Sequence, residues 1–222
     1  GESLVIIGGS GTGKSVTLKC ILGILRHDSG AILIDGRPVE RIDRRAFLRD
    51  FGMLFQGGAL FDSLPVWQNV SFRLRHARKP MGRAEAHALA VAKLGRVGLG
   101  PEVADLYPAE LSGGMQKRVG LARAIATDPS LIFFDEPTAG LDPIMAGVIN
   151  DLIRELVEEM GATAVTITHD MTTVNTVADH VAMLHGGVVR WTGPVEDMAS
   201  CGDPYVEQFI HGRAEGPIAA IR

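Results

Sequence analysis

A glycine-rich octapeptide near the start of the chain constrains its fold more than any other stretch. Residues 8–15 read Gly-Gly-Ser-Gly-Thr-Gly-Lys-Ser and follow the apolar run 4–7, which is the order of a strand, a phosphate-binding loop and a helix. Small residues let the backbone curl until successive N–H groups point into one concavity, and the following helix adds the positive end of its dipole. A Gly/Ser turn with a chance lysine is the alternative, and the helical start at 16–18 argues against it.

The side chains of this loop have complementary uses. Lys14 supplies a point charge for the outer phosphates of a nucleotide, and the Ser15 hydroxyl is a hard oxygen ligand for Mg²⁺. Phosphate binding alone names no function, because kinases, GTPases, motors and transporters share such a loop. The residues that we expect to bind the nucleotide are Gly8, Gly9, Ser10, Gly11, Thr12, Gly13, Lys14, Ser15 and Val16.

Composition excludes several classes of protein. With 222 residues, 46% of them hydrophobic, the chain is large enough for one sizeable core. A net charge of −4 argues against a dedicated nucleic-acid binder. Cys20 and Cys201 have no metal-ligand spacing and are expected to be free thiols. The sequence has no apolar stretch near the ~20 residues that span a bilayer, so we expect a soluble, cytoplasmic chain.

Polar residues follow three predicted strands. The apolar run 131–134 ends in Asp135 and Glu136, the strand at 51–55 ends at Gln56, and the strand at 164–168 ends at His169. Strands that alternate with helical patterns predict an α/β fold with a largely parallel sheet, whose carboxyl ends meet at one edge. We therefore expect these side chains to converge on the phosphate loop.

Each converging side chain has a chemical use there. A carboxylate directly after a buried strand needs a cation, so Asp135 is a predicted Mg²⁺ ligand. Glu136 can polarise a water in line with the γ-phosphate, and His169 can donate a hydrogen bond to that phosphate. The alternatives are two capping acids, a glutamine in a loop and a histidine on the surface. Their convergence favours the functional interpretation.

Between residues 57 and 116 helical patterns replace strands, which indicates an inserted helical lobe. Its basic run at 73–83 is expected to be a solvated helix face, with attraction to anionic lipid headgroups as the alternative. The lobe ends in Ser112, Gly113 and Gly114, a second helix N-terminus suited to an anion. One chain cannot easily use both N-termini on one nucleotide, whereas two chains in a head-to-tail pair can. An ordinary capped turn is the alternative.

The segment Leu-Ser-Gly-Gly-Met-Gln-Lys-Arg at 111–118 resembles the signature of ABC-type ATPases. The order of phosphate loop, Gln56, signature, Asp135-Glu136, Asp142 and His169 matches that family over essentially the whole chain. The resemblance implies ATP and Mg²⁺ as cofactors, with Glu136, His169 and Gln56 catalytic. It implies a metal site of Ser15, Gln56 and Asp135. It also implies that a second copy contributes its own Ser112, Gly113, Gly114, Gln116 and Asp142 to the nucleotide.

The resemblance also implies an architecture. We expect a single ABC ATPase domain over residues 1–222, with a P-loop NTPase core of RecA type and a mostly parallel sheet. The core comprises 1–56 and 119–200, the helical signature lobe 57–118 and a C-terminal tail 201–222. The family normally opens with antiparallel strands that carry an adenine-stacking aromatic residue, and we expect those strands to be truncated here.

Two segments narrow the resemblance. Residues 54–64 and the tail 208–218 look like the ATPase subunit of Mla-type systems, which move phospholipid between the membranes of Gram-negative bacteria. This implies integral-membrane permease partners, a periplasmic lipid-binding MCE subunit in the complex, and a place at the cytoplasmic face of the inner membrane. The apolar Phe209, Ile210 and Ile218 suggest a tail that docks on a neighbouring subunit.

Three alternatives remain within the wider family. The chain could serve another ABC importer with a small polar solute. An ABC domain of DNA repair usually carries a long coiled coil between loop and signature, and the insert here is too short for one. A translation-type factor has two such domains in one chain, and this sequence has one.

Overall fold

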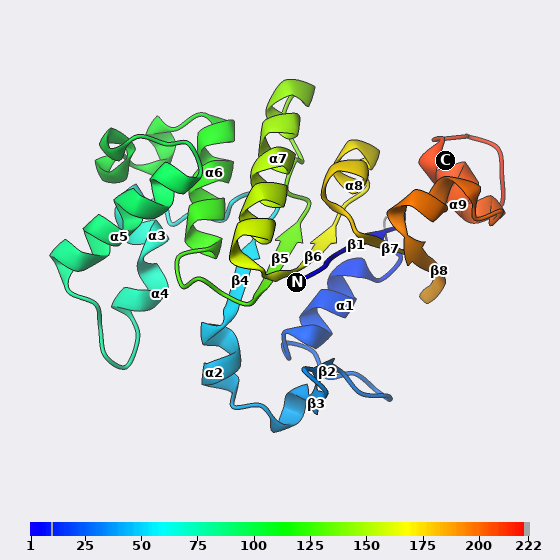
Figure 1. The fold of residues 1–222 in the computed structure, drawn as a ribbon, viewed down its shortest axis with the longest axis horizontal. Helices are drawn as coiled ribbons and strands as arrows, with labels where there is room; N and C mark the ends of the chain where they lie inside the picture. Colours follow the sequence, from blue (N-terminus) through cyan, green and yellow to red (C-terminus); the bar gives the residue numbers. More distant parts are fainter. Residues whose placement is uncertain (10, 220–222) are drawn as a thin grey trace.

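The computed structural model describes residues 1–9 and 11–219, and its framework is one six-stranded sheet (Figure 1). The strand order is β4-β5-β6-β1-β7-β8. The bounds are Ser3–Ile7 for β1, Phe51–Leu54 for β4, Leu131–Asp135 for β5, Thr163–Ile167 for β6, His180–His185 for β7 and Val188–Pro194 for β8.

In this sheet β4, β5, β6, β1 and β7 run parallel, and β8 returns antiparallel to β7 across the Gly186-Gly187 turn. Val5 on β1 pairs with Thr166 on β6, and Phe134 on the same sheet pairs with Leu54 of β4. Because the strands are parallel, their carboxyl ends share one edge. The predicted mostly parallel α/β core is therefore confirmed.

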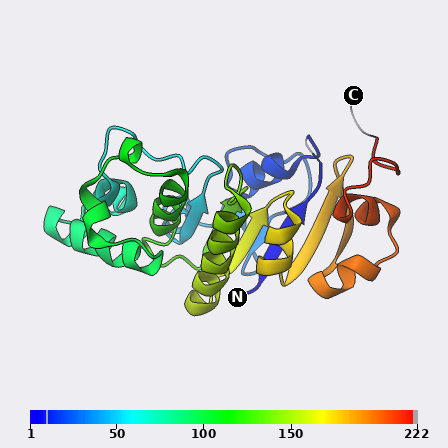
Figure 2. The same cartoon turned by 90° about the horizontal axis from the view of Figure 1, so that it is seen from above.

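Helices cover both faces of this sheet (Figures 1 and 2). Helix α1 lies on one face, and α7 and α8 lie on the other. The helices are α1 (Lys14–Ile21), α2 (Arg44–Arg49), α3 (Val66–Val70), α4 (Phe72–Arg75), α5 (Arg83–Arg96), α6 (Gly113–Ala124), α7 (Pro143–Met160), α8 (Met171–Val177) and α9 (Pro204–Ile210).

Strand β5 shows why both faces are covered. Its side chains alternate, so Phe134 enters the core under α7 and α8 whereas Phe133 enters the core under α1. Both phenylalanines are 1% exposed. The rings of Phe47, Phe51 and Phe133 lie in a row, with centroids 5.6 and 5.0 Å apart. A continuous apolar strand is thus buried on both sides, as its sequence predicts.

Helices α3 to α6 form a lobe beside the β4 edge of the sheet, at the left of Figure 1. The described residues also form four short 3-10 helices, at Val39–Arg41, Pro101–Asp105, Pro108–Glu110 and Val195–Ser200, of which the second and third belong to the lobe. Helix α6 continues through the expected boundary at residue 118, so it belongs to both parts as one rigid element. The boundary between the helical lobe (57–118) and the second part of the core (119–200) stays a prediction.

The basic run at 73–83 is largely exposed, as the sequence predicts, and Arg75 is its one half-buried cation. Arg73 nevertheless donates to the carbonyl oxygen of Phe51 in β4. The guanidinium groups of Arg75 and Arg83 lie over the ring of Trp67, 4.9 and 5.7 Å from its centroid. Attraction between these cations and a backbone carbonyl or an aromatic ring therefore adds specific contacts to an exposed face.

A second, two-stranded sheet follows α1. In it β2 (Leu33–Ile34) pairs with β3 (Arg37–Pro38), as a short hairpin with Asp35 and Gly36 at its turn. Leu33 is 59% exposed. The apolar residues around Leu33 form only a short hairpin strand, because little of the described chain packs against them.

The tail folds back on its own chain. Phe209, Ile210 and Ile218 all pack against the main core. The Gln208 side chain accepts from Ile218 N at 2.6 Å and donates from Nε2 to Ile218 O at 3.0 Å. The apolar residues that suggested docking on a neighbour thus have partners within this chain. None of the helices that the model describes is long and apolar enough to cross a membrane.

Candidate nucleotide-binding site

The glycine-rich loop joins β1 to α1 at the carboxyl edge of the sheet. Gly8 has a φ of 147°, and a Cβ placed there would lie 2.3 Å from the carbonyl oxygen of Leu184. Only glycine fits at this position. Lys14 turns back over the loop, with Nζ donating to Gly8 O at 2.6 Å and Gly9 O at 2.8 Å. Ser10 lies outside the described residues.

One cavity of about 610 Å³ gathers the residues predicted for a single chain. The loop forms one side, and the ends of β4, β5 and β6 form the other. The residues that line the cavity are Gly8, Gly9, Gly11, Thr12, Gly13, Lys14, Ser15, Val16, Gln56, Asp135, Glu136, Ile167, His169 and Phe209. The convergence expected from parallel strands is thus observed.

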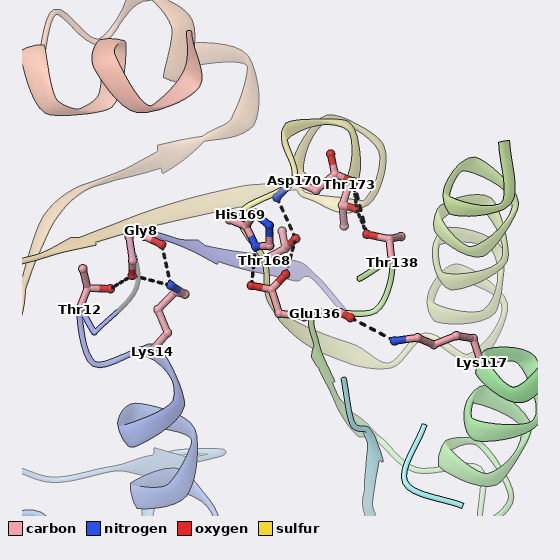
Figure 3. Close-up of polar contacts among 11 residues, drawn as sticks. Gly8, Thr12, Lys14, Lys117, Glu136, Thr138, Thr168, His169, Asp170 and Thr173 are labelled. Carbon is pink, nitrogen blue, oxygen red and sulfur yellow. Dashed lines mark hydrogen bonds and ion pairs between the residues drawn. The ribbon is translucent and has the colours of Figure 1, made fainter. Parts of the chain in front are cut away.

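The carboxylate of Glu136 is held at both oxygens (Figure 3). His169 Nδ1 lies 2.9 Å from Oε1, and the Thr168 hydroxyl donates to Oε2 at 3.3 Å. The backbone of Glu136 has a φ of 48°, which is a strained conformation for a side chain of this size. Its N–H donates to Ile167 O at 2.8 Å. Neighbouring strand ends therefore fix both main chain and side chain.

The charges in the cavity are mixed. Burial and the adjacent Glu136 raise the pKa of Asp135 above its ordinary value, while the ammonium groups of Lys14 and Lys117 oppose that shift. Burial lowers the pKa of Lys14, and the two carboxylates oppose this. Each group is thus partly desolvated and depends on its neighbours of opposite charge.

This set of groups fits a magnesium nucleotide. The loop amides and the Lys14 ammonium suit phosphate oxygens. Asp135, Ser15 and Gln56 offer the carboxylate, hydroxyl and amide oxygens that Mg²⁺ prefers. The cavity is also large enough to hold part of a nucleotide, since ligand pockets commonly have about 300–1,000 Å³.

The residues expected to act on the nucleotide of a second copy do not line this cavity. Ser112 caps α6, with Oγ accepting from Met115 N at 3.3 Å. Asp142 caps α7, with Oδ1 accepting from Ile144 N and Met145 N, each at 3.0 Å. A Cβ on Gly114 would lie 2.7 Å from Met145 Cε, so the starts of α6 and α7 adjoin. These groups, with Gly113 between them, form a separate surface.

Gln116 is turned away from that surface. Its Nε2 donates to Pro108 O at 3.0 Å and to Leu111 O at 3.3 Å, which ties it to the turn before α6. A role toward a nucleotide on another copy stays a prediction for this residue, and the structure gives its amide nitrogen an internal partner.

The sequence reasoning missed Thr168, Lys117 and Phe209. Thr168 is fully buried at the end of β6 and donates to Glu136. Lys117 reaches Glu136 from α6 (Figure 3), and Phe209 lines the cavity from α9. Thr168 directly precedes His169, so its place at a strand end was a usable signal. The other two reach the site from distant segments.

The sheet order, the loop and the paired carboxylates define a P-loop NTPase fold. Comparison with known proteins identifies the family within this fold class. A family model described as ABC transporter matches residues 1–139. The dimeric, post-hydrolysis structure of the ATP-binding cassette MJ0796 with ADP and Pi has a TM-score of 0.76 and 31% identity to this chain. The structural match covers 87% of this chain and 85% of the MJ0796 chain.

Two curated relatives extend over nearly all of the chain. It is 41% identical over 222 residues to the intermembrane phospholipid transport system ATP-binding protein MlaF of Escherichia coli K12, across 98% of this chain and 81% of that protein. It is equally 41% identical to the probable ribonucleotide transport ATP-binding protein mkl of Mycobacterium leprae, where it spans 98% of this chain but only 63% of the relative. The chain belongs to the ABC transporter family, as its motifs predict.

Gly8→Ala is expected to abolish nucleotide binding and to lower the free energy of unfolding. The added Cβ would stand 2.3 Å from the Leu184 carbonyl oxygen, and such strain is on the order of 1–3 kcal/mol. Thermal unfolding and titration with a fluorescent ATP analogue measure the two effects. Gly186→Ala is the control, because its φ is 58° but a Cβ there meets nothing within 4 Å. Normal binding by Gly8→Ala would contradict the loop assignment.

Proposed function

We propose that this chain hydrolyses MgATP as one half of a head-to-tail pair and thereby drives phospholipid transport by membrane partners. The observation that carries the proposal is the Glu136 carboxylate, which His169 and Thr168 hold in the same cavity as the loop and Lys14. A base so oriented beside a phosphate-binding loop is the arrangement that nucleotide hydrolysis requires.

Each residue then has a definite part. The loop amides and Lys14 bind and orient the phosphates, while Ser15, Gln56 and Asp135 hold Mg²⁺. Bound MgATP supplies the phosphoryl group and the metal's neutralising charge. Glu136 accepts a proton from the attacking water at a carboxylate oxygen, and His169 keeps that carboxylate in place through Nδ1. His169 also has a second ring nitrogen to offer the γ-phosphate.

A second copy supplies the rest of the site. The helix starts at Ser112 and Asp142 lie outside the cavity, on a surface where Ser112, Gly113 and Asp142 are exposed. In a head-to-tail pair this surface of one copy would close the nucleotide cavity of the other. The dimeric state of the similar cassette MJ0796 supports such a pair.

An apolar groove supports docking of a permease. A cavity of about 360 Å³ lies between the core and the helical lobe, next to the segment that carries Gln56. Its apolar lining comes from Leu22, Ile24, Leu48, Phe51, Met53, Phe55, Phe61, Phe72 and Ala124, and the side chains of Arg44, Arg73 and Arg123 complete it. A short helix of an integral-membrane permease is the partner we propose for it. The chain would then work at the cytoplasmic face of the inner membrane, in a complex that includes a periplasmic lipid-binding MCE subunit.

Phospholipid is the proposed cargo. The match to MlaF covers more of the relative than the match to mkl, 81% against 63%. The similarity to mkl, a probable ribonucleotide transport protein, favours a second candidate cargo, a ribonucleotide or another small polar solute. Extraction of the purified complex separates the two, because a phospholipid transporter should carry bound phospholipid.

Glu136→Gln is expected to lower kcat at least about 100-fold, since general-base catalysis contributes 10²–10⁴, and to accumulate ATP-bound pairs. Loss of the base leaves the phosphate contacts intact, so binding should persist. Turnover and size-exclusion chromatography with ATP measure both outcomes. Glu155→Gln, an exposed carboxylate on α7, is the matched control. Undiminished turnover in Glu136→Gln would show that Glu136 has been misassigned.

Ile24→Asp is expected to abolish assembly with the permease while the free chain remains folded. Ile24 lines the groove and is 61% exposed, so the charge is tolerated by the fold but not by an apolar partner. Val189→Asp is the control, at a position 60% exposed in strand β8. Affinity purification of the tagged chain with its membrane and periplasmic subunits gives the measurement. A normal complex with Ile24→Asp would rule out this groove.

A further inference from the structure

Cations of the helical lobe hold the backbone of residues 51–59, the segment that carries Gln56. Arg73 donates to Phe51 O, Lys117 to Gln56 O, and Arg123 to Gly58 O and Ala59 O. Burial lowers the pKa of all three side chains. Four main-chain carbonyls of one short segment are thus fixed by three partly desolvated cations from another part of the chain.

Lys117 differs from the two arginines. It is 6% exposed, and its Nζ also donates to the main-chain carbonyl of Glu136 at 3.4 Å (Figure 3). Among the hydrogen bonds of the described residues, Lys117 alone joins the main chains of Gln56 and Glu136. The adjacent carboxylates of Glu136 and Asp135 offset the desolvation of its ammonium group.

The position of Lys117 on α6 links this contact to the surface at Ser112. The same helix begins at Gly113, directly after Ser112, on the surface that the proposed pairing would bring to the nucleotide of another copy. A helix of 12 residues moves as one body. A displacement at its N-terminus would therefore reach Gln56 and Glu136 through the Lys117 side chain.

We propose that Lys117 is a positioning residue, which couples the signature helix to the main chains of Gln56 and Glu136. This inference rests on the proposed ATPase function. Lys117 acts through hydrogen bonds to two carbonyls, and any side chain with N–H donors of similar reach should replace it in part. An apolar side chain of the same length should not, because it leaves two carbonyls without their donor.

The test compares Lys117→Met with Lys117→Gln in the assembled transporter. The Met variant is expected to lose about 10- to 100-fold in kcat, since small misplacements of catalytic groups have effects of that size. KM for ATP should change less than about twofold, because Lys14 and the loop are untouched. The Gln variant, which matches Met in length but keeps two N–H donors, should recover part of the kcat that Met loses. Arg123→Met, in a cation that donates only to the 51–59 segment, is the control for the exchange measurement on the free chain, because Arg123 also lines the groove proposed for the permease.

Hydrogen exchange gives a readout that does not need turnover. Lys117→Met should speed amide exchange at both 51–59 and 135–139 in the folded chain, whereas Arg123→Met should speed it at 51–59 only. Normal kcat in Lys117→Met, or equal losses in Met and Gln, would overturn the coupling role. Absence of hydrolysis by the wild-type complex would instead refute the proposed function, and the exchange data would still test the contact.

Discussion

Asp135 and Glu136 stand next to each other where a buried strand ends, and their charges need cations close by. Burial and mutual repulsion raise the pKa of Asp135, and Lys14 and Lys117 oppose that shift. One lysine comes from the phosphate loop and the other from the helical lobe. The two acids therefore link three segments that are far apart in the sequence. Because an unpaired charge that is partly buried is unfavourable, one cation from the loop and one from the lobe both favour the pair of carboxylates at this strand end.

The nucleotide cavity of one chain lacks the helix starts at Ser112 and Asp142. The described residues that line the cavity place phosphate ligands and a base within one chain, whereas the helix starts at Ser112 and Asp142 face elsewhere. A site with cations and a base but an exposed face suits a mechanism in which a second surface closes over the nucleotide. In the proposed transporter, that closure would also move the helical lobe, and with it the groove beside Gln56.

Much of this could be predicted from the sequence because the decisive signals are local. The glycine loop, the apolar strand before Asp135 and the strand ends at Gln56 and His169 each span a few residues, and parallel pairing brings them together. The contacts of Lys117 and Arg73 could not be predicted. Lys117 meets Gln56 across 61 positions and Arg73 meets Phe51 across 22, and no periodicity reports such pairs. Arg73 is exposed, as the sequence predicts, but its contact with Phe51 cannot be seen in the sequence. The packing of Phe209 and Ile218 against the core of their own chain could not be predicted for the same reason.

The central claim is that each nucleotide site is shared between two copies, and mixed pairs test it most directly. One chain carries Lys14→Ala, which disables its loop, and the other carries Ser112→Arg, which disables its helix start. The two chains carry different tags, so that complexes with one of each can be purified. A shared site predicts that each variant alone is inactive and that the mixed complex recovers about half of the wild-type ATPase rate, because one loop and one helix start remain intact and face each other. If the mixed complex is as inactive as the two variants alone, the site is not shared in this way.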